Sequence, residues 1–437
     1  MITMKYYSLN NNAPVVDFRE ATIKGQAPDK GLYFPELIPV VDPELITNIN
    51  SYSKEELAYR IMLPYIGNTI TQETLYDIVS ETIHFSFPLV AIKENIAALE
   101  LFHGPTLAFK DVGARFISRC LGYFSQQQRE PVTVLVATSG DTGGAVANGF
   151  LGVEGVKVII LYPSGKVSLV QELQLTTCGK NITALEVHGT FDDCQAMVKD
   201  AFMDADLNKK FRLTSANSIN IARWLPQQLY YFFAYQQWKQ KEQPPVISVP
   251  SGNFGNLCAG LLAHISGLPV QHFIAACNAN DAVPEYLQTG YYQAKKAVPT
   301  ISNAMDVGSP SNFIRILELF QHNYAHIKEK ISGCTVDDAI TRKTIGEVYH
   351  QYNYVLDPHG AVGYYALQQY LLQHPNQHGI VLETAHPVKF PETVEAETGQ
   401  KIAIPLTAQY LFDQEKKSVH MEPLFESLKD WMMTHTG

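Results

Sequence analysis

Short runs of apolar, often β-branched residues recur through the middle of the chain, and each is followed by a turn. Residues 132–137, 156–162 and 182–187 are almost continuously apolar rather than alternating between apolar and polar positions. Strands that are buried on both faces have this near-continuous pattern, which is typical of parallel sheets. We therefore expect three buried strands in this part of the chain.

Helical patterns follow these runs. The first is opened by residues 145–147, and a second runs through residues 170–173 and stops near Gly179, a favourable residue at a helix C-terminus. Thr190 can cap a third helix, since its hydroxyl can accept a hydrogen bond from the first helical turn. The apolar residues of that helix recur at helical spacing: Cys194, Met197, Val198 and Phe202.

The same alternation continues toward the C-terminus. Residues 221–238 predict a long aromatic helix, residues 246–249 a strand, residues 257–262 a helix and residues 379–382 another buried strand. Strands that alternate with helices predict an α/β fold with a mostly parallel sheet covered on both faces.

Residues 1–85 interrupt this alternation. They include Asn-rich and Pro-containing stretches, with one helical piece around residues 55–62, and we expect a separate N-terminal subdomain there. The chain has 437 residues, more than one hydrophobic core usually organises, so two or three domains are expected.

Composition narrows the class of partner. Hydrophobic residues at 46% and charged residues at 17% describe a soluble globular protein with enough apolar material for a core. The formal net charge of −10 disfavours a nucleic acid or an anionic membrane as partner, because both favour a basic surface. An anionic small molecule is still compatible, since single loops can be positive in an acidic protein.

Location and metal content are also constrained. The N-terminus lacks the features of a secretory signal, and no apolar run approaches the roughly 20 residues that span a bilayer. The six cysteines are scattered without a Cys-x-x-Cys pair, which indicates reduced core residues and a cytoplasmic protein. The 14 histidines show no clustered ligand spacing, so no structural zinc is expected.

Lys110 is the strongest candidate for chemistry. It follows an apolar pair, Ala108-Phe109, in the run from His103 to Asp111. Partial burial would lower the pKa of its amine, and a neutral amine is what a Schiff base with a carbonyl cofactor requires. The alternative is an ordinary surface charge, which most lysines are.

Two glycine-rich turns each stand between a predicted strand and a predicted helix. The turn at residues 251–256, Ser-Gly-Asn-Phe-Gly-Asn, exposes N–H groups that can bind an anion with the help of the helix dipole. It matches neither a Walker A loop nor a Rossmann fingerprint, so a single phosphate monoester fits better than ATP or NAD. The alternative is a strand-to-helix turn without a ligand.

The other turn, residues 139–144, carries Ser139, Asp141 and Thr142 among its glycines. Its hydroxyl and N–H groups can hold a substrate carboxylate. The alternative is a turn in which Asp141 binds its own backbone.

Thr384 follows the last predicted strand, which places it at the carboxyl edge of the sheet, where open α/β folds bind ligands. A threonine there can also be a plain strand residue. His103 and His359 stand in turns and are more typical of hydrogen-bonding residues than of catalysts.

Together these motifs resemble the threonine synthase family, whose members are pyridoxal-phosphate (PLP) enzymes of the tryptophan-synthase-β fold type (fold type II). The resemblance covers nearly the whole chain and is similar in character to the bacterial and fungal branch. The segments that carry it are residues 31–35, 104–110, 137–143, 191–195, 217–220, 249–255 and 384–390.

The resemblance implies a fold and a set of roles. Two mostly parallel α/β subdomains would hold PLP between them within residues 86–437, the smaller lying within about residues 130–240 and the larger formed by the remainder. Lys110 matches the lysine that binds PLP covalently, and Thr384 matches the hydroxyl that meets the pyridine nitrogen. The phosphate turn would be Gly252, Asn253, Phe254, Gly255 and Asn256, and the substrate carboxylate would be held by Ser139, Gly140, Asp141 and Thr142.

Three positions depart from the family pattern. Asn256 stands where the family often has Asp, Glu383 replaces a small residue beside Thr384, and Ser164 stands where a basic residue is common. The last departure leaves open which residues contact the substrate phosphate. None of the three removes a catalytic group.

The resemblance implies that the protein converts O-phospho-L-homoserine and water to L-threonine and phosphate. Lys110 would act as the general base at Cα and at Cβ. A related PLP lyase, giving 2-oxobutyrate and ammonia from phosphohomoserine or threonine, is the first alternative. A catalytically silent α/β protein that binds a phosphometabolite is the second. The sequence leaves open whether the protein is a monomer or a homodimer.

Overall fold

Each of two units in the chain is built around its own parallel sheet. The computed structural model describes residues 4–128 and 131–435. Unit 1 is made mainly of Phe34–Phe109 and Trp224–Ala403. Unit 2 is made of Lys5–Tyr33, Lys110–Arg223 and the C-terminal segment from Ile404. The chain therefore passes from unit 1 to unit 2 at the peptide bond between Phe109 and Lys110.

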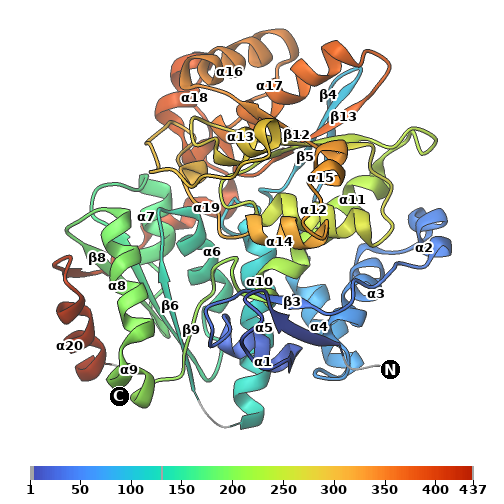
Figure 1. The fold of residues 1–437 in the computed structure, drawn as a ribbon. Coiled ribbons are helices and arrows are strands. Elements are labelled where there is room, and N and C mark those ends of the chain that lie inside the picture. The colour runs from blue at the N-terminus through green and yellow to red at the C-terminus, as the bar shows by residue number, and fades with distance from the viewer. Residues whose placement is uncertain (1–3, 129–130, 436–437) are drawn as a thin grey trace. The chain divides into compact units, whose positions relative to one another are not determined.

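The sheet of unit 2 has five strands, all paired in parallel, and some of its central strands are labelled in Figure 1. These strands are almost entirely buried, which explains their continuously apolar sequences. Their order across the sheet is β14 (Val419–Met421), β8 (Ile182–Val187), β7 (Val156–Pro163), β6 (Val132–Ala137) and β9 (Leu213–Thr214).

Helices α1, α7, α8 and α9 of unit 2 each follow a residue whose side chain caps the first turn. Thr190 and Asp193 form a reciprocal capping box at the start of α8, as the sequence predicts for Thr190. The helices are α1 (Phe18–Lys24), α5 (Lys110–Gln128), α6 (Asp141–Phe150), α7 (Leu169–Thr176), α8 (Phe191–Met203), α9 (Ala205–Lys210), α19 (Leu406–Gln409) and α20 (Phe425–His435), with the 3-10 turn η5 (Tyr410–Asp413).

Both faces of the unit 2 sheet are covered. Residues of α8 and α20 form one core cluster with Leu135, Ile159 and Leu185 from neighbouring strands. Helices α5 and α6 contact β7 and each other but contribute no residue to that cluster, so they cover the opposite face. The short strands β1 (Lys5–Ser8) and β2 (Val16–Asp17) pair antiparallel beside this layer.

The sheet of unit 1 has six strands. All its pairs are parallel except that of β4 with β5, which form an antiparallel edge. The order is β12 (Ile331–Thr335), β11 (His272–Cys277), β10 (Val246–Pro250), β13 (Gly379–Glu383), β5 (Ile96–Glu100) and β4 (Leu89–Lys93).

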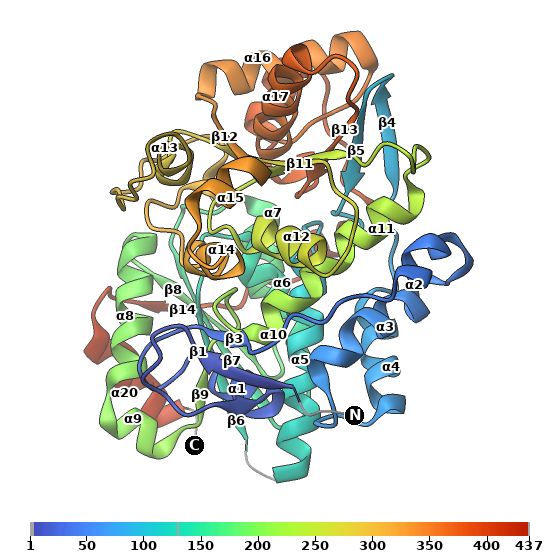
Figure 2. The same ribbon diagram turned by 45° about the vertical axis from the view of Figure 1, so that its right-hand side comes forward.

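One face of this sheet is covered by α17, which lies beside α16 (Figure 2). The apolar residues of α17 pack together with those of α16 and α18. On the other face α12 lies so close that a Cβ on Gly260 would approach the ring of Phe273 to 2.9 Å. The helices of unit 1 are α2 (Pro43–Thr47), α3 (Lys54–Ile66), α4 (Gln72–Thr82), α11 (Leu229–Gln237), α12 (Gly255–Ile265), α13 (Ala282–Thr289), α14 (Phe313–Leu319), α15 (Tyr324–Lys330), α16 (Asp338–Tyr352), α17 (Pro358–Gln373) and α18 (Pro391–Thr398).

Short elements join these layers. Strand β3 (Tyr33–Pro35) and helix α10 (Ile221–Trp224) stand where the chain passes between the units. The 3-10 turns of unit 1 are η1 (Ile49–Ser51), η2 (Leu225–Gln228), η3 (Asn303–Met305) and η4 (Pro387–Lys389).

Several elements differ from the sequence expectation. The aromatic helix expected over residues 221–238 is broken into α10, η2 and α11, because Pro226 cannot donate to the preceding turn. Helix α6 starts at Asp141, earlier than the expected residues 145–147. Residues 5–33 lie in unit 2 and residues 34–85 in unit 1, and an N-terminal subdomain over residues 1–85 stays a prediction.

The structure also bears on membranes and metals. No described helix combines the length and the apolar character needed to cross a membrane. Within residues 4–128 and 131–435, no group of three or more His, Cys, Asp or Glu side chains is placed to hold a metal ion. All six cysteines are thiols, and four of them are buried: Cys120, Cys194, Cys258 and Cys277.

Candidate active site

Lys110 is the first residue of α5 and begins the second chain segment of unit 2. Its side chain is only 17% exposed, so it is not an ordinary surface charge. Its Nζ lies 3.7 Å from Oδ2 of Asp141, the first residue of α6. The N-termini of α5 and α6 thus place Lys110 next to Asp141, a residue of the predicted substrate turn.

The turn at residues 139–144 is organised by Thr138, just before it. The Thr138 hydroxyl accepts hydrogen bonds from the N–H groups of Gly140 (3.0 Å) and Gly143 (2.8 Å). Gly140 has a φ of +134°, which L-residues with a side chain rarely adopt. The hydroxyls of Ser139 and Thr142 are partly exposed and make no hydrogen bond with any described residue.

Asp141 differs from its neighbours in the turn because its side chain is 4% exposed. Its Oδ1 accepts a hydrogen bond of 2.9 Å from Nε2 of Gln171, a buried residue of α7. The Oδ2 atom is the one that faces Lys110. The Asp141 carboxylate is therefore directed at groups of the protein.

The turn at residues 251–256 connects β10 to α12 in unit 1. A Cβ on Gly252 would lie 2.7 Å from Cα of Met305 and 2.9 Å from O of Ala304, so glycine is required by the neighbouring main chain. Phe254 adopts the left-handed region with φ of 62° immediately before α12 begins.

Side chains fasten this turn from two directions. Asn253 Oδ1 accepts hydrogen bonds from N (2.6 Å) and Oγ (2.9 Å) of Ser311, and Asn312 donates to the Asn253 carbonyl. Asn256 donates from Nδ2 to the Pro250 carbonyl at 2.8 Å, which closes the turn onto the end of β10. The two asparagines thus fix the main chain of the turn.

These features fit a phosphate group. The first residues of a helix present N–H groups that have no partner inside the helix, and the helix dipole favours a negative charge there. The turn is closed tightly at Gly252 and locked by Asn253 and Asn256, so its N–H groups are held in fixed directions. The turn therefore fits a phosphate group such as the one that PLP carries.

Thr384 directly follows β13, which pairs in parallel with β10. The turn after β10 and Thr384 therefore leave neighbouring strands at the same edge of the unit 1 sheet. Thr384 is 6% exposed, and its hydroxyl makes no hydrogen bond with any described residue. Its carbonyl accepts a hydrogen bond of 2.9 Å from N of Phe109, the residue before Lys110.

Residues 106–109, which precede Lys110, are held by contacts with residues 384–389 within unit 1. Ala108 and Ala385 form an antiparallel bridge, and buried Lys389 donates from Nζ to the Thr106 carbonyl at 2.7 Å. The chain then enters unit 2 at Lys110. The predicted site residues thus fall into two groups, one in each unit.

Glu383, the departure beside Thr384, is fully buried at the end of β13. Its carboxyl group lies against Gly360 in the first turn of α17, where a Cβ would meet Oε1 at 1.7 Å. Burial raises the pKa of Glu383 well above its usual value, and the negative charge of Asp357 raises it further. Both causes favour the protonated, neutral form of the Glu383 carboxyl group.

The remaining candidates have structural partners. His359 interacts through Nδ1 with Oδ1 of Asp357 at 2.5 Å, and its Nε2 accepts a hydrogen bond from N of Ala304. His103 pairs with Glu100 at 2.7 Å. Ser164 donates to Oε1 of Glu186 at 2.7 Å.

Three residues that shape the site were not predicted from the sequence: Thr138, Gln171 and Ser311. A Ser168-x-x-Gln171 capping box marks the start of α7 and was a usable signal for that helix. Nothing local in the sequence indicates that Gln171 also reaches Asp141, 30 residues away.

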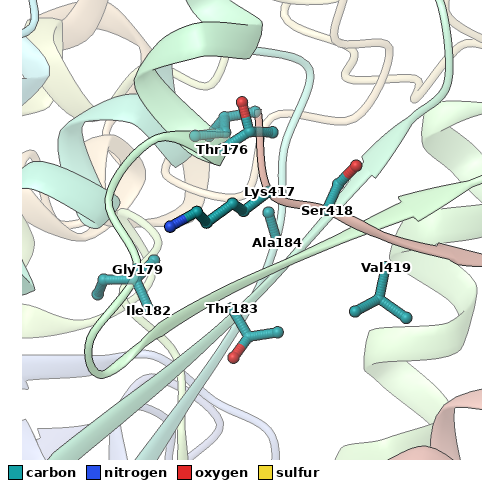
Figure 3. Close-up of a pocket in the computed structure, with 9 residues that line it drawn as sticks. Thr176, Gly179, Ile182, Thr183, Ala184, Lys417, Ser418 and Val419 are labelled. Carbon is teal, nitrogen blue, oxygen red and sulfur yellow. The ribbon is translucent and has the colours of Figure 1, made fainter. Parts of the chain in front are cut away.

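A pocket of about 200 Å³ opens elsewhere in unit 2 (Figure 3). Residues around the end of α7 and the start of β8 line it together with Lys417 and Ser418. None of the predicted site residues lines this pocket, so it adds nothing to the candidate site.

Comparison with known proteins identifies the family. Three family models match: "Threonine synthase N terminus" over residues 5–83, "Pyridoxal-phosphate dependent enzyme" over residues 88–382, and "Threonine synthase, C-terminal" over residues 360–432. A threonine synthase of Buchnera aphidicola from Acyrthosiphon pisum is 43% identical over 432 residues, covering 98% of this chain and 100% of the relative.

Solved structures agree with this match. The crystal structure of threonine synthase from Escherichia coli superposes with a TM-score of 0.92 at 42% identity, covering 99% of this chain and 100% of the other. PLP-bound threonine synthase from Brucella melitensis has a TM-score of 0.93 at 34% identity, covering 99% of each chain. The chain belongs to the threonine synthase family of PLP-dependent enzymes.

Proposed function

We propose that the protein converts O-phospho-L-homoserine and water to L-threonine and inorganic phosphate. Support comes from the full-length relatives that are threonine synthases and from the match to both threonine synthase family models. The structural observation that carries the proposal is the largely buried Lys110, because a desolvated amine is what covalent attachment to a carbonyl cofactor requires.

Within this proposal the unit 1 residues hold PLP. The N–H groups of Gly252, Phe254 and Gly255 bind its phosphate, while Asn253 and Asn256 keep the turn in shape. The Thr384 hydroxyl, which has no hydrogen-bond partner among the described residues, binds the pyridine nitrogen. PLP, when bound, supplies an electron sink for charge that develops on the substrate.

The unit 2 residues act on the substrate. Lys110 attaches the cofactor and, once released as an amine, takes a proton at Nζ from Cα of the substrate. It passes this proton on before it takes a second one from Cβ, so that it carries one proton at a time. The Ser139 and Thr142 hydroxyls and the N–H groups of the turn, including Gly140, bind the substrate carboxylate. Because an unsaturated intermediate must be protected from early hydrolysis, we expect water to be excluded during turnover.

One assay tests this proposal. Purified protein is incubated with PLP and O-phospho-L-homoserine, and threonine, phosphate, 2-oxobutyrate and ammonia are counted together. Equal amounts of threonine and phosphate are expected. 2-Oxobutyrate and ammonia as the main products would instead identify the alternative lyase. Lack of any product, together with no cofactor absorbance band, would identify a non-catalytic binding protein.

We also propose a cytoplasmic location. Support comes from the six cysteines, which are all thiols in a chain of this length. Fractionation of the source cells with an antibody to the protein tests it, and recovery outside the cytoplasmic fraction would contradict it.

A further inference from the structure

We infer that Asp141 is a positioning residue for Lys110, and that its carboxylate orients the amine and stabilises the proton that this amine carries between steps. The inference rests on the proposed role of Lys110 as base. Oδ2 of Asp141 lies 3.7 Å from Nζ of Lys110. An opposite charge at this distance favours the protonated amine and shifts its pKa upward.

The position of Asp141 is imposed by its surroundings. Gln171 donates to Oδ1, and Gln171 is itself held by the capping box of α7, in which its Oε1 accepts from N of Ser168 at 3.1 Å. A Cβ on Gly140 would lie 2.5 Å from Cδ of Gln171, so glycine makes room for this side chain. The Asp141 carboxylate is therefore oriented before any ligand binds.

The dipoles of α5 and α6 act differently on the two side chains of the pair. Lys110 begins the 19-residue α5, whose positive end disfavours an ammonium group. Asp141 begins α6, whose positive end favours a carboxylate. The α5 dipole lowers the pKa of Lys110 and Asp141 raises it, so the pair keeps the amine able both to accept and to return a proton.

The proton balance is simple. The neutral Lys110 amine accepts a proton from a substrate carbon and becomes an ammonium group beside the Asp141 carboxylate. The same proton is returned to carbon in a later step, and the amine is neutral again. Asp141 transfers no proton in this scheme, and the hydrogen bond from Gln171 to its Oδ1 favours the charged form of the carboxylate.

This role differs from binding the substrate carboxylate. Two carboxylates in contact repel each other, whereas the Ser139 and Thr142 hydroxyls and the N–H groups of the turn can bind the substrate without that cost. The same turn therefore serves two purposes: its main chain and hydroxyls face the substrate, and the Asp141 side chain faces Lys110.

Chemical labelling of the full chain freed of PLP gives a direct test. The pKa of the Lys110 amine is measured from its rate of acetylation by acetic anhydride between pH 6 and 11, scored on the Lys110 peptide by mass spectrometry. Asp141→Asn should lower this pKa by about one to three units. Exposed Lys199 in the same digest reports on labelling conditions, and Asp200→Asn on α8 is the matched control.

Charge and shape are separated by a second variant. Asp141→Glu keeps the charge and should leave the pKa of Lys110 close to that of the parent. In the PLP-loaded enzyme Asp141→Asn should lower kcat and move the acid limb of its pH profile with little change in KM. An unchanged Lys110 pKa in Asp141→Asn, or an equal drop in Asp141→Glu, would overturn the inference. If Asp141→Asn does not fold, as judged by circular dichroism, Asp141→Ser takes its place.

Failure of this inference is distinct from failure of the proposed function. The parent enzyme forming threonine while Asp141→Asn leaves the Lys110 pKa unchanged would remove only the role of Asp141. A parent that forms no threonine would remove the proposed reaction, while the pKa measurement on the PLP-free chain would stand by itself.

Discussion

The two glycine-rich turns have similar sequences and similar places, but they are constructed in opposite ways. Each follows a buried parallel strand and leads into a helix, residues 251–256 in unit 1 and residues 139–144 in unit 2. In unit 1 the space beside Gly252 is filled by the main chain of Ala304 and Met305. In unit 2 the space beside Gly140 is filled by the Gln171 side chain.

The difference indicates what each turn can bind. The unit 1 turn is fixed by asparagine hydrogen bonds and offers main-chain N–H groups, which suits a permanently bound phosphate. The unit 2 turn brings the charged side chains of Asp141 and Lys110 together, which suits groups that gain and lose protons. This difference supports the proposal that the unit 1 turn binds the cofactor phosphate and that Asp141 of the unit 2 turn orients the Lys110 amine.

The largest effect is expected at Lys110. Lys110→Ala should reduce turnover by at least about 10³-fold, because it removes both the covalent attachment and the general base. PLP should still bind non-covalently through the unit 1 turn. Threonine formation and the absorbance of the bound cofactor measure the two effects separately. Near-normal threonine formation would remove Lys110 from the mechanism.

The next effect separates the two turns directly. In the Lys110→Ala background, Gly252→Val should weaken PLP binding by about 10- to 100-fold, since its side chain would overlap the main chain of Met305. Gly140→Ala in the same background should leave PLP affinity nearly unchanged, although it displaces Gln171. Equilibrium dialysis measures both. Equal losses in the two variants would contradict the division of roles.

Substitutions of Thr384 test the proposed contact between unit 1 and the pyridine nitrogen of PLP. Thr384→Val keeps the shape and removes the hydrogen bond to the pyridine nitrogen, so we expect a loss of about 1–3 kcal/mol in transition-state stabilisation. Thr384→Asp should hold a proton on that nitrogen and shift products toward 2-oxobutyrate. Counting threonine and 2-oxobutyrate together tests both variants. If both match the parent in products and spectra, Thr384 is only a strand residue.

The smallest effect concerns Glu383 and the pH dependence of stability. Its raised pKa means that the folded protein keeps a proton that the unfolded chain releases above about pH 4.5. Stability conferred by this neutral acid is therefore complete below that pH and is lost as pH rises toward the folded pKa. Glu383→Gln should remove this loss.

Urea unfolding of the PLP-free chain between pH 4.5 and 8 measures this effect. The free energy of unfolding of Glu383→Gln, relative to that of the parent, should increase as pH rises. A constant difference across this range would show that Glu383 is ionised in the folded protein. Unit 1 would then also hold a buried charged side chain beside its predicted site residues.

Much of the fold could be predicted from the sequence. The strands at residues 132–137 and 182–187 have the predicted bounds, because a buried parallel strand needs a continuous apolar run. The Thr190 cap is likewise a local signal. Helix α5, which Lys110 begins, was not predicted, and the helix expected over 221–238 is interrupted at Pro226.

The site was less predictable than the fold. The sequence indicates Lys110, both glycine turns and Thr384, because lysine, glycine and hydroxyl residues at strand ends are local features. Gly140 and Phe254 have positive φ values, whereas Gly252 is limited by a close main chain. Steric limits of that kind depend on residues 304 and 305, far away in the sequence.

By itself, the sequence determined which segments form strands, turns and helices and which residue types carry chemistry, because these follow from short-range preferences and from burial. Only the tertiary structure decided what each of those residues faces. The carboxylate of Asp141 is paired with Lys110 and Gln171, and burial near Asp357 raises the pKa of Glu383. These partners come from separate elements, and their proximity results from packing around a sheet, which no local pattern encodes.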